Sequence, residues 1–151
     1  MLAPILIFAI GNESRGDDAL APLLLRRLEA GGISAKVELL EDYQLQIENI
    51  TDLQGRDAVL FIDADVSCEP PFELSPITAA IDHSYTSHAM TPFALLHTYT
   101  QVYTTAAPPV YLLRIRGYDF ELGNPLSDTA SVNLEAALTK VREWLVQFHS
   151  P

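Results

Sequence analysis

The sequence feature that most constrains the fold is an apolar run near the start, from Pro4 to Ile10, followed by a loop with the adjacent carboxylates Asp17 and Asp18. An apolar run bounded by turn-forming residues is typical of a strand that is buried on both faces. A helix tolerates Pro22 only in its first turn, so the next helix must begin near residues 18–20. The segment therefore predicts a strand, a loop and a helix that place carboxylates at one edge of a sheet.

The same alternation continues along the chain. Further strands are predicted at residues 35–40, 57–65 and 110–115, with a short edge strand at 72–74 inside a proline-rich connection, and helices at about 20–30, 46–53, 93–102 and 131–148. Strands that alternate with helices favour an α/β fold. We expect a single domain over residues 1–151 with three layers, in which helices cover both faces of a mostly parallel twisted sheet. Ligands of such sheets bind beyond the carboxyl ends of the strands.

Composition excludes several classes of function. A formal net charge of -11 disfavours binding to nucleic acid or to anionic membrane surfaces. No apolar run approaches the roughly 20 residues that a membrane-spanning helix needs. Cys68 is the one cysteine, so no internal disulfide can form, and the chain opens with a strand rather than a signal segment. We therefore expect a cytoplasmic protein without membrane or nucleic-acid partners.

Three side chains are candidate metal ligands. Asp18, Asp63 and His88 each lie at or near a strand-to-helix connection that should reach the same sheet edge. Two carboxylates and one imidazole could hold a divalent metal there. The sequence has no paired cysteines and no HExxH helix, which argues against a dedicated structural zinc site. An incomplete, exchangeable metal site fits these residues better.

Each candidate also has an ordinary structural interpretation. Asp18 could cap the following helix, Asp63 could accept hydrogen bonds from loop amides, and His88 could be a partly buried histidine. His83 and His97 compete with His88 for the role of imidazole ligand, although His97 lies about two helical turns further on. The sequence leaves these alternatives open.

No catalytic nucleophile or general base can be assigned from the sequence. Asp17 and Asp65 are predicted to be caps or loop hydrogen-bond acceptors rather than ligands. Ser14 and Ser87 have no His-Asp relay at a recognisable spacing, and Cys68 has no basic neighbour that would lower the pKa of its thiol. The catalytic residues are therefore unknown at this stage.

The loop from Gly11 to Gly16 has the position of a phosphate-binding loop but not its chemistry. Both GxGxxG and GxxxxGK[ST] are absent. Glu13, Asp17 and Asp18 would also place negative charge where phosphate oxygens must lie. We therefore expect no nucleotide cofactor.

Three motifs together resemble those of the nickel-iron hydrogenase maturation endopeptidases. They are Gly11-Asn12 with Gly16-Asp17-Asp18 and Pro22, then Ile62-Asp63-Ala64, and then Ser87-His88-Ala89-Met90. Their order and spacing agree, and the resemblance runs nearly from end to end of the chain. In that family the positions that match Asp18, Asp63 and His88 bind nickel.

The resemblance implies an aspartic-type endopeptidase that removes a C-terminal extension from the hydrogenase large-subunit precursor after nickel insertion. The nickel would arrive inside the precursor and would serve for recognition. A non-proteolytic nickel checkpoint or delivery protein is the main alternative, and a self-sufficient metallopeptidase is a third. Where many members have an Asp-Gly-Gly-Thr-like turn, this chain has Glu41 to Gln46. That segment is similar to members that serve bidirectional, NAD(P)-linked hydrogenases.

Overall fold

The computed structural model describes residues 2–80 and 90–148. Within these residues, five strands form one sheet: β1 (Ile5–Ile10), β2 (Val37–Asp42), β3 (Ala58–Asp65), β4 (Phe72–Ile77) and β5 (Val110–Arg116). Their order is β2-β1-β3-β5-β4. The first four strands in this order are parallel, and β4 pairs with β5 in the antiparallel direction. The predicted α/β fold with a mostly parallel sheet is confirmed.

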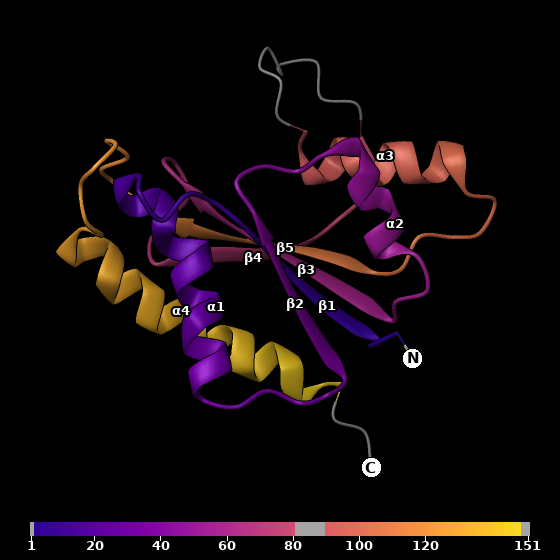
Figure 1. Ribbon diagram of the computed structural model, residues 1–151, viewed down its shortest axis with the longest axis horizontal. Coiled ribbons are helices and arrows are strands. Elements are labelled where there is room, and N and C mark those ends of the chain that lie inside the picture. Colours follow the sequence, from indigo (N-terminus) through magenta and orange to yellow (C-terminus); the bar gives the residue numbers. More distant parts are fainter. Residues whose placement is uncertain (1, 81–89, 149–151) are drawn as a thin grey trace.

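Helices cover both faces of the sheet, as predicted. Figure 1 shows α1 (Leu20–Ala30) and α4 (Asp128–Val146) on one side, and α2 (Ile50–Leu53) and α3 (Pro92–Val102) on the other. Short 3-10 turns, η1 (Gly16–Ala19) and η2 (Ile47–Asn49), precede α1 and α2. Within the part of the chain that is described, no helix has the length and apolar character needed to cross a membrane.

The core consists of two clusters that the sheet separates. In β1, Ile5, Ile7 and Ala9 pack with α1 and α4, whereas Leu6 and Phe8 pack on the side of α2 and α3. This alternation follows from the two-residue period of a strand. Because β1 is buried on both faces, it fixes the position at which the following loop begins.

Two predicted boundaries differ from the structure because of local hydrogen bonds. β2 begins two residues late because Ser34 starts a turn, in which its carbonyl accepts from Val37 N at 3.1 Å. α4 begins three residues early because Ser127 caps it, with Oγ accepting from Ala130 N at 3.2 Å. In both cases a serine accepts the hydrogen bond, once through its backbone carbonyl and once through its side chain. Hydrophobic periodicity alone does not locate such boundaries.

The segment after β3 is less purely connective than the sequence predicted. The expected short strand extends to Ile77 and forms the antiparallel edge strand β4. Pro76 lies opposite Tyr111 in this pair. Proline cannot donate to a ladder on its own side, so an edge strand can hold it where a central strand could not.

Candidate functional site

One row of paired residues, near the carboxyl edge of the parallel strands, carries four ionisable side chains. Ile10 lies opposite Asp42 on one side and Asp63 on the other, Asp63 lies opposite Arg114, and Arg114 lies opposite Glu73. Ile10 packs in the core beneath α2 and α3, so this row faces that side of the sheet. On this face of the sheet, the side chains therefore change from apolar to acidic and basic at this row.

Asp18 and Asp63, two of the three predicted metal ligands, line the same cavity. The cavity measures about 290 Å³. Its other walls come from the end of β1, the loop after β2 and the start of α3: Ile10, Tyr43, Gln44, Leu45, Met90, Thr91 and Pro92. A carboxyl group from η1 and one from β3 thus line one cavity at the carboxyl edge of the sheet.

The charge of Asp18 disfavours ionisation of Asp63. Burial, the largest cause, and the charges of Asp18 and Asp65 together raise the pKa of Asp63 to about 8, while a hydrogen bond from Ala64 opposes the shift. Burial also raises the pKa of Asp18, against the effects of Asn12 and Arg15. A divalent cation between the two groups would relieve this repulsion and displace the proton of Asp63. The donor chemistry therefore fits a cation.

The third predicted ligand, His88, lies outside the described residues. Within residues 2–80 and 90–148, no group of three or more His, Cys, Asp or Glu side chains is placed to hold a metal ion. The convergence of His88 with Asp18 and Asp63 therefore stays a prediction.

The competing histidines do not enter the cavity where they can be placed. His97 lies in α3 and does not line the Asp18–Asp63 cavity. His83 lies outside the described residues.

Asp18 is not a helix cap, which was one alternative from the sequence. The turn η1 separates the loop from α1, and the residue that precedes α1 is Ala19. The Asp18 carboxylate instead accepts a hydrogen bond from Asn12 N at 2.8 Å. Because this side chain supports neither helix end, its place beside Asp63 is not explained by capping.

Asp17 has a structural role that the sequence indicated only in outline. Its buried carboxylate accepts from the backbone nitrogens of Tyr118, Asp119 and Ser127 at 2.7, 3.0 and 2.7 Å, and from Ser127 Oγ at 2.8 Å. Burial raises the pKa of Asp17, but these hydrogen bonds outweigh it and hold the pKa below its ordinary value. Asp17 therefore ties the loop after β1 to the loop after β5, which lie side by side in Figure 1.

Two glycines permit this loop geometry. Gly16 has φ +54°, and a Cβ there would overlap the backbone carbonyl of Asp119. A Cβ on Gly11 would overlap the backbone carbonyl of Asp18. Both positions therefore need glycine because the backbone segments approach closely.

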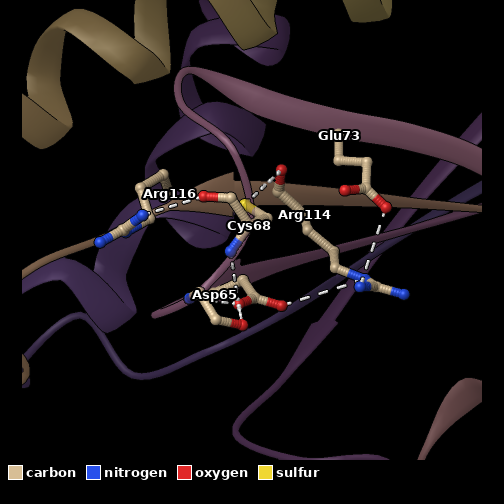
Figure 2. Close-up of polar contacts among 6 residues, drawn as sticks. Asp65, Cys68, Glu73, Arg114 and Arg116 are labelled. Atoms are coloured by element: carbon tan, nitrogen blue, oxygen red, sulfur yellow. Dashed lines mark hydrogen bonds and ion pairs between the residues drawn. The ribbon is translucent and has the colours of Figure 1, made fainter.

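Asp65 is a hydrogen-bond acceptor in the loop after β3, as predicted, whereas Cys68 has the basic neighbours Arg116 and Arg114 that the sequence did not indicate. Asp65 Oδ1 accepts from Ser67 N at 2.7 Å, Ser67 Oγ at 2.9 Å and Cys68 N at 3.2 Å, and Figure 2 shows Asp65 beside Cys68. Burial and the nearby charges of Asp65 and Glu73 raise the pKa of the Cys68 thiol. Cys68 is therefore not an activated thiolate nucleophile.

Sequence reasoning missed Arg114, which lies opposite Asp63 in the neighbouring strand. The available signal was a basic residue near the end of an otherwise apolar strand, as in Val110–Arg116. Its place beside Asp63 depends on the strand order. β5 lies between β3 and β4, so it pairs with β3 as well as with β4, the strand that precedes it in the sequence.

Comparison with known proteins gives one kind of match. No protein-family model matches the sequence, and no curated protein matches it. Among solved structures, a hydrogenase maturating endopeptidase, HybD from E. coli, has a TM-score of 0.76 and 22% identity, over 96% of this chain and 93% of that chain. The [NiFe] hydrogenase maturation protease HycI from Thermococcus kodakarensis has a TM-score of 0.69 and 18% identity, over 93% and 91%.

A third solved structure, the hydrogenase 2 maturation peptidase from a Thaumarchaeota archaeon, has a TM-score of 0.66 and 20% identity, over 93% of this chain and 97% of that chain. At these identities the likeness shows the fold. This chain has the fold of the hydrogenase maturation proteases, as the resemblance in its motifs implied.

Proposed function

We propose that this chain is an endopeptidase that removes the C-terminal extension of a nickel-iron hydrogenase large-subunit precursor after nickel insertion. The observation that carries the proposal is the Asp18–Asp63 pair in one cavity, on a fold shared with named maturation endopeptidases over 96% of the chain. The family motifs around both aspartates support the same conclusion. The proposed partner is the precursor, and the proposed location is the cytoplasm.

Nickel belongs to the substrate in this proposal. Asp18, Asp63 and His88 would ligate the nickel that the precursor already holds and so bring the cleavage site to this cavity. Carboxylate and imidazole ligands do not by themselves select nickel over copper or zinc. Selectivity would therefore come from the precursor, and the isolated protein should fold without metal.

The segment Glu41 to Gln46 bears on which hydrogenase is served. Tyr43, Gln44 and Leu45 line the cavity that holds both aspartates. On the sequence resemblance of this segment we favour a bidirectional, NAD(P)-linked hydrogenase as the source of the precursor.

The mass of the precursor distinguishes proteolysis from the checkpoint alternative. The wild-type protein is incubated with a nickel-loaded large-subunit precursor, and both chains are followed by mass spectrometry. Loss of the C-terminal extension supports the endopeptidase. An intact precursor in a stable complex would instead support a nickel checkpoint or delivery protein, and cleavage of unrelated peptides with added zinc would support a self-sufficient metallopeptidase.

His88→Ala and Asp18→Asn should each abolish processing with little change in stability. His88 is the proposed imidazole ligand, and Asp18→Asn keeps an acceptor for Asn12 N while it removes the ligand charge. We expect the free energy of unfolding to change by less than about 1 kcal/mol in each variant, because neither removes a large buried apolar side chain. Urea unfolding and precursor cleavage are measured side by side.

The matched control for these variants is His97→Ala, since His97 does not line the cavity. This control should process the precursor normally. Normal cleavage by His88→Ala would refute the role given to His88.

A further inference from the structure

A second cavity adjoins the first on the β5 side of Asp63. It measures about 300 Å³ and shares Asp63, Thr91 and Pro92 with the Asp18–Asp63 cavity. Its remaining walls are Ala64, Asp65, Phe93, Leu112 and Arg114. A peptide that reaches Asp63 can therefore continue into a space that has Arg114 in its wall.

The guanidinium of Arg114 is held only loosely. Figure 2 shows it between Asp65 and Glu73, with Nε 3.9 Å from Asp65 Oδ2 and Nη1 3.9 Å from Glu73 Oε1. Both separations exceed hydrogen-bond distance. Its side chain is 33% exposed. Among residues 2–80 and 90–148, no hydrogen bond engages its side-chain donors, so these donors can receive a ligand.

Two other arginines, Arg116 and Arg56, are engaged differently. Arg116 Nη1 donates to the Cys68 carbonyl at 3.0 Å, as Figure 2 shows. Arg56 donates to the carbonyls of Ala3 and Asp52, at 2.8 Å each. These two side chains donate to backbone carbonyls, whereas the Arg114 side chain is partly exposed and lines the second cavity.

The charge around Arg114 narrows the chemistry of its ligand. Among the described residues that line the two cavities, Arg114 is the one basic residue, so a negatively charged ligand finds its charge partner there. A guanidinium pairs with a carboxylate through two parallel hydrogen bonds. Phe93 and Leu112 give the same cavity apolar walls that suit the stem of such a side chain.

We propose that Arg114 binds a carboxylate of the precursor's C-terminal extension and so positions the extension beside the bond to be cleaved. This inference rests on the proposed function. Adjacent strands lie about 4.8 Å apart and an extended peptide rises about 3.3 Å per residue, so the carboxylate belongs within a few residues of the cleavage site. Its source is either an acidic side chain of the extension or, in a short extension, the C-terminal carboxylate itself.

The test measures binding and cleavage separately. Wild type, Arg114→Gln and Arg114→Lys are each titrated with three forms of the nickel-loaded precursor: unmodified, with the acidic residues of the extension changed to amides, and with an amidated C-terminus. Arg27→Gln is the matched control, because Arg27 pairs with Glu135 between α1 and α4, away from both cavities.

We expect Arg114→Gln to weaken binding of the unmodified precursor, and to raise KM, by about 10- to 100-fold, as the loss of a charge-assisted pair implies. The kcat should stay within about twofold if Arg114 positions rather than reacts. Arg114→Lys should recover part of the loss, because lysine keeps the positive charge but cannot donate two parallel hydrogen bonds to a carboxylate. One modified form of the precursor should bind equally well to wild type and to Arg114→Gln. The carboxylate that this form lacks is the one that Arg114 binds.

Other outcomes overturn the inference. An Arg114→Gln loss no larger than that of Arg27→Gln, or an equal loss on all three precursor forms, would mean that Arg114 contacts no carboxylate of the extension. If the wild type binds the precursor in this carboxylate-dependent way without cleaving it, the proteolytic function fails and the Arg114 contact stands. If the wild type does not bind the precursor, both fail.

Discussion

Asp17→Asn is expected to lower the free energy of unfolding by about 3 kcal/mol or more, because it leaves buried hydrogen-bond donors without an acceptor. The Asp17 carboxylate accepts four hydrogen bonds from Tyr118, Asp119 and Ser127. An amide in its place would turn an NH2 group toward these donors. For a chain of this size the melting temperature should fall by about 6 to 12 °C.

The effect of Asp17→Asn should depend on pH in a definite direction. Since the folded protein holds the pKa of Asp17 below its ordinary value of 3.8, the stabilisation is present above about pH 4 and is lost as the pH falls through the folded pKa. The difference between variant and wild type should therefore narrow in acid. Thermal unfolding between pH 3 and pH 8 measures it.

Asp128→Asn is the control for Asp17→Asn, because Asp128 is an exposed carboxylate in the first turn of α4. It should cost no more than about 1 kcal/mol through the helix dipole. If Asp17→Asn is as stable as Asp128→Asn, the four hydrogen bonds do not join the two loops as described.

In contrast to Asp17→Asn, Asp63→Asn is expected to raise the free energy of unfolding at neutral pH. It should also reduce processing of the precursor to below detection. The variant keeps the side-chain shape and removes a charge that burial and Asp18 both disfavour. It also removes a proposed nickel ligand. We expect a gain of about 2 to 4 kcal/mol in the free energy of unfolding at pH 8.

The sign of this gain follows from the raised pKa. The folded pKa of Asp63 is about 8 and its ordinary value is 3.8, so unfolding releases a proton between these values. The stability of the wild type should therefore decrease as pH rises from about 4 to about 8, relative to Asp63→Asn, and the two should converge below about pH 4. Denaturant unfolding across this range measures the difference.

Asp57→Asn serves as the control for Asp63→Asn, since Asp57 is exposed immediately before β3. This variant should change neither stability nor processing by much. A loss of stability in Asp63→Asn at pH 8 would contradict the environment that we describe for Asp63.

The central sheet, and the place of Asp18 and Asp63 at one edge of it, could be predicted because local sequence and strand direction determine them. The apolar run of β1 and its turn residues indicate a buried strand, and Pro22 fixes the start of α1 within a turn. Parallel strands then bring their carboxyl ends to one edge, which is why Asp18 and Asp63 were expected to meet. Both aspartates line one cavity as a result.

The remaining features depend on contacts between distant segments. The acceptor role of Asp17 depends on donors that lie 101 to 110 residues further along the chain. Arg114 faces the site because β5 lies beside β3, which the strand order decides. The edge strand β4 includes Pro76, which local propensity counts against any strand. Periodicity carries none of this information.

The most direct measurement of nickel-directed processing compares the rates at which the wild-type protein cleaves nickel-loaded and metal-free forms of the same precursor. Recognition of the metal by Asp18, Asp63 and His88 predicts cleavage of the loaded form alone, with no rescue by free nickel that the precursor has not incorporated. Equal rates on the two forms would contradict it.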